Sequence, residues 1–189
     1  MKTKTKTLYE DIENLIRAKT EGILQVGDEL ITTDIDGRAV FVVAHITSSK
    51  IRFIRKYILM QEKPMKSDDF NLLVWLGDTY ARSLPEDIQR RIWKNVTLPT
   101  EKQVFGVNEI GKPEERKQWK YFRNTKHKIA TLGIADEHSR WWWLRTPYYD
   151  ESRGVVSSTY FAFVSSGGRA SNFNASYSHG VRPAFTIRA

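Results

Sequence analysis

Residues 141–147, Trp-Trp-Trp-Leu-Arg-Thr-Pro, begin with the first strand-like segment after the sequence pattern changes from Ile129 onward. Two more strand-like segments, 160–164 and 181–187, follow them. In a strand, Trp141 and Trp143 point to one side and Trp142 to the other. At least one side faces the core, so we expect two of the three indoles to be buried; stacking on a sugar or base is the alternative.

The first half of the chain predicts a helix followed by a hairpin. Thr7 and Glu10 have capping-box spacing, which predicts a helix over about 8–19. Asp36-Gly37 is a strong turn sequence and lies between two strand-like segments, 29–33 and 38–46. A third strand is expected at 51–58.

Three further helices are expected in the middle of the chain. Asp68 or Asp69 can cap the first, whose apolar face is Leu72, Leu73, Leu76 and Tyr80. Pro85 begins the second, with Ile88 and Ile92 inside, and Pro113 begins the third, which runs to about Arg123. Helices in the first two-thirds and strands at both ends predict an α+β fold, in which N- and C-terminal strands pair in an antiparallel sheet.

Composition limits the possible chemistry. The chain has 189 residues, 40% of them hydrophobic, which suits a single domain over 1–189 with an N-terminal tail and helix in 1–21. It has no cysteine, which excludes disulfides, thiolate nucleophiles and cysteine-ligated metals. No apolar run is long enough for a membrane helix, and no export signal is recognised.

Catalytic and metal-binding patterns are not found, so we expect a non-enzymatic protein without metal or cofactor. The histidines, His45, His127, His138 and His179, have no metal-ligand spacing, and adjacent Asp136, Glu137 and His138 point in different directions. Ser166-Gly167-Gly168 is interpreted as a hairpin turn. Asp34 and Asp36 are interpreted as solvated carboxylates beside a tight turn.

The net charge of +8 is uneven along the chain. Residues 1–111 hold 17 basic and 16 acidic side chains, whereas 112–189 hold 13 and 6. Segment 112–128 is the most basic part, which suits either a solvated helix and loop or contact with phosphate. One alternative function is therefore nucleic-acid binding through this segment, with Trp119 and Tyr121 stacking on bases. Another is a structural domain with one fixed protein partner.

The motif at 141–147, followed after some thirty polar, small and aromatic residues by Gly180-Val181-Arg182-Pro183-Ala184-Phe185, resembles a bacterial and phage domain family of unknown function. The resemblance covers most of 22–189. The ending also resembles the variable proteins of diversity-generating retroelements, which share a C-type-lectin-like fold with formylglycine-generating enzymes. It implies a C-type-lectin-like fold that displays a mutable surface to a receptor or other ligand, in a cytoplasmic or virion-associated protein. The cysteines of the formylglycine enzymes and the calcium motifs of lectins are absent.

Residue usage in the tail agrees with such a role. These retroelements randomise adenines, chiefly in Asn codons, which yields any residue except Lys, Glu, Gln, Met and Trp. Those five types fill 40 of the first 145 positions, but only Glu151 among the 44 residues from Thr146 onward. Loops and strands are generally poor in Lys, Glu and Gln, which explains part of this depletion.

The expected ligand-binding residues are of the types that adaptable binding loops use, and they lie within the loop-rich region 141–189. We expect them to be largely exposed on one contiguous face, with Gly154, Gly167, Gly168 and Gly180 in turns. Arg145 and Arg182 are expected to anchor the loops through backbone carbonyls or carboxylates. The expected contact residues are Tyr148, Tyr149, Ser158, Tyr160, Phe163, Ser165, Ser171, Phe173, Tyr177 and His179.

Overall fold

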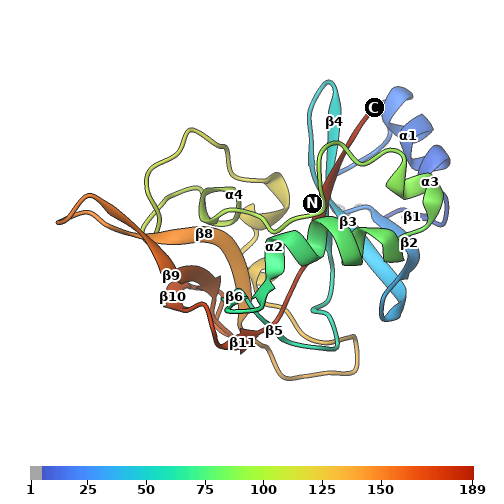
Figure 1. Ribbon diagram of the computed structural model, residues 1–189. Coiled ribbons are helices and arrows are strands. Elements are labelled where there is room, and N and C mark those ends of the chain that lie inside the picture. Colours follow the sequence, from blue (N-terminus) through green and yellow to red (C-terminus); the bar gives the residue numbers. More distant parts are fainter. Residues whose placement is uncertain (1–5) are drawn as a thin grey trace.

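The computed structural model describes residues 6–189 as a mixed α+β fold with mainly antiparallel sheets (Figure 1). Its longer strands are β2 (Glu29–Asp34), β3 (Gly37–Ile46), β4 (Lys50–Arg55), β8 (Trp142–Asp150), β9 (Val155–Val164), β10 (Ala170–Asn174) and β12 (Ala184–Arg188). The short strands are β1 (Leu8–Tyr9), β5 (Lys63–Pro64), β6 (Lys66–Ser67), β7 (Phe70–Asn71) and β11 (Ser178–His179). The helices are α1 (Ile12–Thr20), α2 (Leu72–Trp75), α3 (Glu86–Gln89) and α4 (Glu101–Phe105), with a π-helical turn η1 (Leu76–Tyr80) and 3-10 turns η2 (Ala81–Ser83), η3 (Lys120–Arg123) and η4 (Thr125–Lys128).

A five-stranded sheet in the order β1-β2-β3-β4-β12 joins the two ends of the chain. The expected sharing of one sheet by N- and C-terminal strands is confirmed, since β12 pairs antiparallel with β4 and places Phe185 opposite Phe53. These two rings stack with centroids 4.9 Å apart, and Phe41 meets Phe185 edge-on at 5.0 Å. Buried side chains cover both faces of this sheet, because alternate residues of β3 enter two different hydrophobic clusters.

A three-stranded antiparallel sheet, β10-β9-β8, forms the other end of the molecule. Trp142 and Trp143 at the start of β8 are fully buried, but in opposite clusters, whereas Trp141 is 40% exposed. The expectation of two buried indoles is confirmed. Gly180 lies against this point, since a Cβ there would come within 2.7 Å of both Ile58 and the carbonyl oxygen of Trp141.

The first helix begins later than predicted. Residues Leu8 and Tyr9 form β1, which pairs parallel with β2, so Thr7 cannot cap a helix. Asp11 caps α1 instead, since its side chain accepts a hydrogen bond from the Glu13 amide at 2.6 Å. Similarly, Asn71 rather than Asp68 or Asp69 caps α2.

The predicted helix from Pro113 to Arg123 was wrong. Only its last four residues turn, as η3, because Tyr121 and Phe122 must enter the core and the Trp119 amide bonds to the carbonyl of Gln103. The helix that the sequence did not predict is α4, which Thr100 begins with a capping box and Gly106 ends at φ 81°.

The interpretation of Asp34 and Asp36 as solvated carboxylates was also wrong. The Asp34 side chain is fully buried, where it accepts hydrogen bonds from Arg55 Nε at 2.7 Å and from the Tyr80 hydroxyl at 2.6 Å. Arg55 also contacts Asp36 at 3.0 Å and donates to the carbonyls of Tyr57 and Ile58. This network fixes the β2–β3 hairpin to the segment after β4, and burial together with the Asp34 charge raises the pKa of Tyr80.

Candidate functional site

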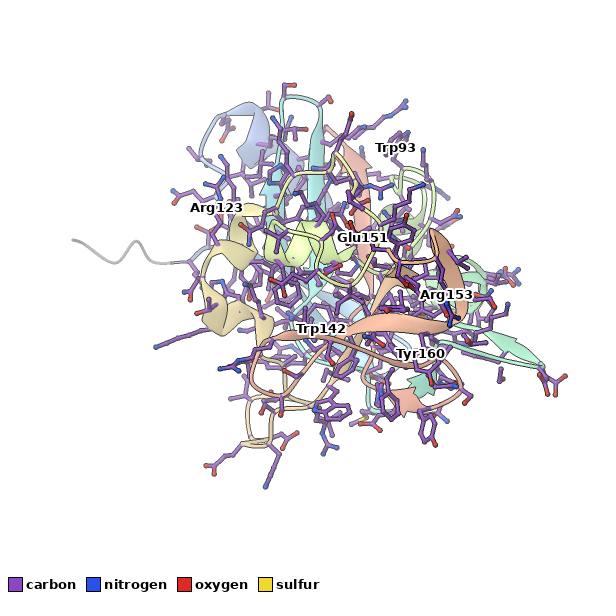
Figure 2. All side chains as sticks on the ribbon, turned by 90° about the vertical axis from the view of Figure 1, so that its left-hand side faces the viewer. Trp93, Arg123, Trp142, Glu151, Arg153 and Tyr160 are labelled. Carbon is purple, nitrogen blue, oxygen red and sulfur yellow. The ribbon has the colours of Figure 1, made fainter. Side chains whose placement is uncertain are left out.

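The hairpin between β8 and β9 projects from the body of the molecule (Figure 1). Figure 2 looks onto the end from which it projects, where Glu151, Arg153 and Tyr160 are labelled. Asp150 organises the tip by accepting hydrogen bonds from the Ser152 hydroxyl at 2.6 Å and from the amides of Ser152 and Arg153. The Ser152 hydroxyl, followed by the other donors at the tip, holds the pKa of Asp150 below its usual value. Gly154 completes the turn at φ 66°.

A second turn connects β9 to β10. The predicted Ser166-Gly167-Gly168 turn is confirmed, with Gly168 at φ 77° and the Ser165 amide donating to the Arg169 carbonyl at 2.8 Å. Both turns join strands whose register is fixed by antiparallel pairing. The loop-rich tail is therefore built on paired strands, with register shifts in the β8–β9 pairing on both sides of Pro147, and these strands support exposed side chains.

One face of this sheet carries an aromatic cluster around His179. The ring centroids of Trp143, Trp141 and Phe163 lie 4.6, 5.3 and 5.5 Å from that of His179. Phe173 adds a further contact at 5.6 Å and Tyr177 packs edge-on against it. Phe163 and Phe173 are drawn together because the strands pair Phe163 with Ser171 and Phe161 with Phe173 on the same face.

His179 itself is half-buried within these rings. Burial lowers the pKa of its imidazole, which favours the neutral ring near pH 7. Its Nε2 atom is buried and has no hydrogen-bond partner among the described residues. The ring therefore packs as a flat, largely apolar member of the cluster.

The opposite face of the same sheet carries Tyr160, with Ser158 and Tyr149 further out along the hairpin. Tyr160 is opposite Asn174, which puts its side chain on the other side from Phe163. Tyr149 is opposite Val156, beyond a register shift in the β8–β9 pairing. Beside Ser158 lies a hollow of about 290 Å³, which is also lined by Lys66 and Asp68 from an earlier part of the chain. The exposed end of this face thus combines aromatic, hydroxyl and charged groups.

The structure divides the predicted contact residues into two faces and several degrees of exposure. Ser158, Tyr160 and Tyr177 are exposed. The prediction that Phe163 is exposed was wrong, because as the cross-strand partner of Trp143 it enters the core and retains only 3% exposure. The single contiguous face was also wrong, since alternation along β9 separates Tyr160 from Phe163. The half-buried members are Tyr148, Tyr149, Ser165, Ser171, Phe173 and His179.

Sequence reasoning left two groups out of the candidate surface. Trp141 is exposed and stacks on Phe163 with ring centroids 4.7 Å apart. Its position two residues before Trp143, and so on the same side of the strand, could have indicated that it belongs to this surface. Lys66 and Asp68 lie beside the candidate surface only because of tertiary packing, in which the Lys66 amide donates a hydrogen bond to the carbonyl of Ala175. No local pattern links residues so far apart.

The two arginines expected as anchors behave differently. Arg182 is fully buried and donates to the carbonyls of Arg55 and His127, each at 3.1 Å, as expected. Its guanidinium lies 4.8 Å from the Trp142 ring centroid, and burial lowers its pKa to about 10. Arg145 is only half-buried, and its Nε finds no partner among the described residues.

The basic segment 112–128 presents cations but not the expected stacking platform. Trp119 and Tyr121 retain only 5% and 6% exposure, so neither is available to stack on a base, and that expectation was wrong. The rings enter the core with Phe122, because the segment lies against β3 and β8. Its exposed cations include Lys117, Lys120 and Arg123.

Metal-ligating groups do not converge within residues 6–189. No three His, Asp or Glu side chains there are placed to hold one ion. His138 contacts Asp136 at 3.5 Å, and the amides of His138 and Leu132 hold the pKa of Asp136 below its usual value. Asp136 accordingly caps its own loop.

Comparison with known proteins gives one match. A family model described as "Domain of unknown function (DUF6273)" matches residues 53–189, from β4 to the end of the chain. No curated protein and no solved structure matches. Among the helices of residues 6–189, none has the length and apolar character needed to cross a membrane.

Proposed function

This chain belongs to the DUF6273 family of domains of unknown function. We propose that it is a non-enzymatic module that binds a protein or cell-surface ligand. The binding surface is the outer part of β8, β9 and β10 with the adjoining segment 176–179. The observation that carries the proposal is the change in exposure along β9. Ala162 to Val164 are buried at its inner end, whereas Ser158 to Tyr160 are exposed at its outer end.

The chemistry of the outer end suits recognition. Exposed Tyr160 and Tyr177 offer large contact areas at a low entropic cost, and neighbouring Ser158 and Ser176 offer adaptable hydrogen bonds. Tyr160 stands on β9, where it pairs with Asn174 of β10, and Ser176 and Tyr177 lie in the turn that follows β10, where the Tyr177 amide donates to the Asn174 carbonyl. Such backbone pairing orders the support before a ligand arrives. Exposed Trp141 stacks on Phe163 and offers a second aromatic surface on the other face of the sheet.

We include a C-type-lectin-like fold in this proposal. In the family-matched range, the first strand, β4, and the last, β12, pair antiparallel, and a separate three-stranded sheet lies between them in sequence. Pairing of terminal strands beside a second, loop-bearing sheet is the arrangement that the sequence resemblance implies. An experimental structure compared with C-type-lectin-like proteins tests this part directly.

We further propose that a retroelement diversifies this surface. The test is to sequence the coding locus in many isolates and to search beside it for a near-identical copy of the tail and a reverse transcriptase. Differences should fall at template adenines in the codons of exposed Ser158, Tyr160 and Tyr177. The codons of buried Ala162, Phe163 and Val164 serve as the matched control. Equal variation in both sets, or no template copy, would contradict the retroelement proposal.

The binding surface can be tested without knowing its ligand. Two display libraries, each varying four exposed positions, are selected against the same unrelated folded protein. The first varies Ser158, Tyr160, Ser176 and Tyr177; the control varies Asp78, Arg82, Glu86 and Arg90. We expect binders from the first library at a clearly higher frequency. Equal yields would show that the tail is no better a binding surface than ordinary helix surface.

A second candidate function is polyanion binding through the basic segment. The observation that favours it is the environment of His45, whose pKa is lowered by burial and then by Arg52, Lys120, Arg123 and Lys117. Four cations so close together suit a phosphate backbone. Such binding should weaken steeply with salt, with a slope in log affinity of about −0.7 to −0.9 per phosphate contacted. A flat salt dependence, or no binding of single-stranded DNA, would exclude it.

A further inference from the structure

A separate hollow lies at the root of the projecting hairpin. It has a volume of about 290 Å³ and is lined by Lys112, Arg116, Arg145, Glu114 and two threonines, Thr100 and Thr146. These residues come from β8, the residue before α4, and the loop that follows α4. The sequence predicted a helix over much of this loop, so it did not predict the hollow.

Arg145 is the unusual member of this set. Its Nε is buried and has no hydrogen-bond partner among the described residues. Burial lowers the pKa of its guanidinium, and the nearby charge of Arg116 lowers it further. A desolvated cation beside a second cation is unfavourable unless an anion joins them.

The one carboxylate in the lining, Glu114, forms an ion pair with Arg116 and so offsets only one of the three cations. Glu114 is already engaged, since it accepts hydrogen bonds from the Thr100 hydroxyl and from Arg116. Three cationic side chains and one carboxylate leave a net charge of +2. A carboxylate ligand would leave half of this charge uncompensated, whereas a dianion would neutralise it.

The walls of the hollow are fixed before any ligand arrives. The fully buried carboxylate of Glu101 accepts hydrogen bonds from the amides of Glu109, Ile110 and Gly111, at distances of 2.8 to 3.2 Å. This holds the loop that leads into Lys112. Gly111 allows the close approach, because a Cβ there would lie 2.1 Å from the methyl group of Thr146. Preorganised donors reduce the entropic cost of binding an anion.

We propose that this hollow binds a phosphate dianion, either the free ion or the monoester group of a larger ligand. The guanidinium groups of Arg145 and Arg116 donate to its oxygens, and Lys112 closes the mouth. A phosphate monoester carries a charge of about −1.5 to −2 at pH 7, which matches the excess charge of the lining. The site is independent of the proposed tail surface, although Lys112 Nζ also lies 5.9 Å from the Tyr149 ring centroid.

The test is calorimetric titration of the full chain with inorganic phosphate, N-acetylphosphoserine and acetate at constant ionic strength. We expect the wild type to bind phosphate at one site and acetate at least about tenfold more weakly, since a hydrogen bond between charged groups contributes about 1.5–3 kcal/mol. Binding of phosphoserine identifies a monoester ligand; its exclusion, with phosphate bound, identifies the free ion.

Three variants locate the site. Arg145→Gln should weaken phosphate binding by about tenfold or more, because it removes a charge-assisted donor. Lys112→Gln, at an exposed position, should weaken it by a smaller factor and keeps the test decisive if the first variant does not fold. Lys126→Gln removes an exposed cation outside the hollow and should leave the affinity unchanged. No phosphate binding by the wild type, equal affinity for acetate, or wild-type affinity in both hollow variants would overturn the proposal.

Discussion

The two sheets of this protein share an alternating strand pattern but differ in how much of each sheet is buried. In the five-stranded sheet, both faces are covered, and even the charged Asp34 and Arg55 are enclosed with their partners. In the three-stranded sheet, burial stops part of the way along β9, and the outer residues reach solvent. The difference shows that the strands themselves do not decide which positions are exposed to solvent; the segments that cover them do.

This contrast has an energetic consequence. A residue in a covered region loses transfer free energy and leaves a cavity when it is shortened, whereas an exposed residue loses little. Trp141 and Trp143 are two positions apart, yet one is 40% exposed and the other fully buried. They allow buried and exposed tryptophans to be compared at the start of the same strand, β8.

The largest effect is expected for Trp143→Ala, which should lower the free energy of unfolding by about 3–5 kcal/mol because it empties a fully buried site. Trp141→Ala serves as the matched control and should cost markedly less. Urea unfolding followed by circular dichroism measures both. Equal losses would mean that the outer aromatic cluster is as much part of the core as Trp143.

The next effect tests the enclosed ion pair of the five-stranded sheet. Asp34→Ala should cost about 3 kcal/mol, because it removes the closest partner of buried Arg55. Tyr80→Phe removes only one donor to the same carboxylate and should cost about 1.5 kcal/mol. Chemical unfolding of both variants gives the two values. A loss below about 1 kcal/mol for Asp34→Ala is typical of a surface ion pair and would contradict the burial of the Asp34–Arg55 pair.

A smaller, pH-dependent effect should come from the half-buried histidines. Burial lowers the folded-state pKa values of His45, His127 and His179 below the unfolded value of about 6.5. Below that pH the unfolded chain binds more protons, so stability is full above about pH 6.5 and falls as the pH drops through the lowered values. Unfolding free energies measured between pH 7.5 and 5 should show this decline, and His179→Phe should make it shallower. If the pH dependence of the unfolding free energy is unchanged in that variant, His179 does not contribute to the decline.

The smallest effects should be at the outer end of the three-stranded sheet. Ser158→Asn, Tyr160→Ser and Tyr177→Ser should each change the free energy of unfolding by no more than about 0.5 kcal/mol, because these side chains are exposed. The triple variant should keep its melting temperature within a few degrees. Phe163→Ser, on the same hairpin but buried, is the matched control and should lose several kcal/mol. Collapse of the triple variant would end the idea of a tolerant surface.

The sequence by itself determined features that depend on neighbouring residues. Asp36-Gly37 predicted the β2–β3 hairpin, and Ser166-Gly167-Gly168 predicted the β9–β10 turn, because positive φ angles favour such residues locally. Alternation predicted that Trp142 and Trp143 face opposite sides and that two of the three indoles are buried. The exposure of Ser158, Tyr160 and Tyr177 was predicted from the family resemblance together with the residue types of the tail, the same reasoning that placed Phe163 wrongly.

The tertiary structure alone decided how distant segments complete or cover these elements. Asp34 is enclosed because Tyr80, 46 positions away, donates to it, and Arg182 is held by the carbonyl of Arg55, 127 positions away. Segment 113–123 has a helical sequence pattern but is mostly non-helical, because Tyr121 and Phe122 are buried in the core. Arg145 and Arg182 look equivalent in sequence, yet only Arg182 meets carbonyl groups where it is buried. Local periodicity specifies which way a side chain points, but its burial and its partners depend on the packing of residues that are far apart in the chain.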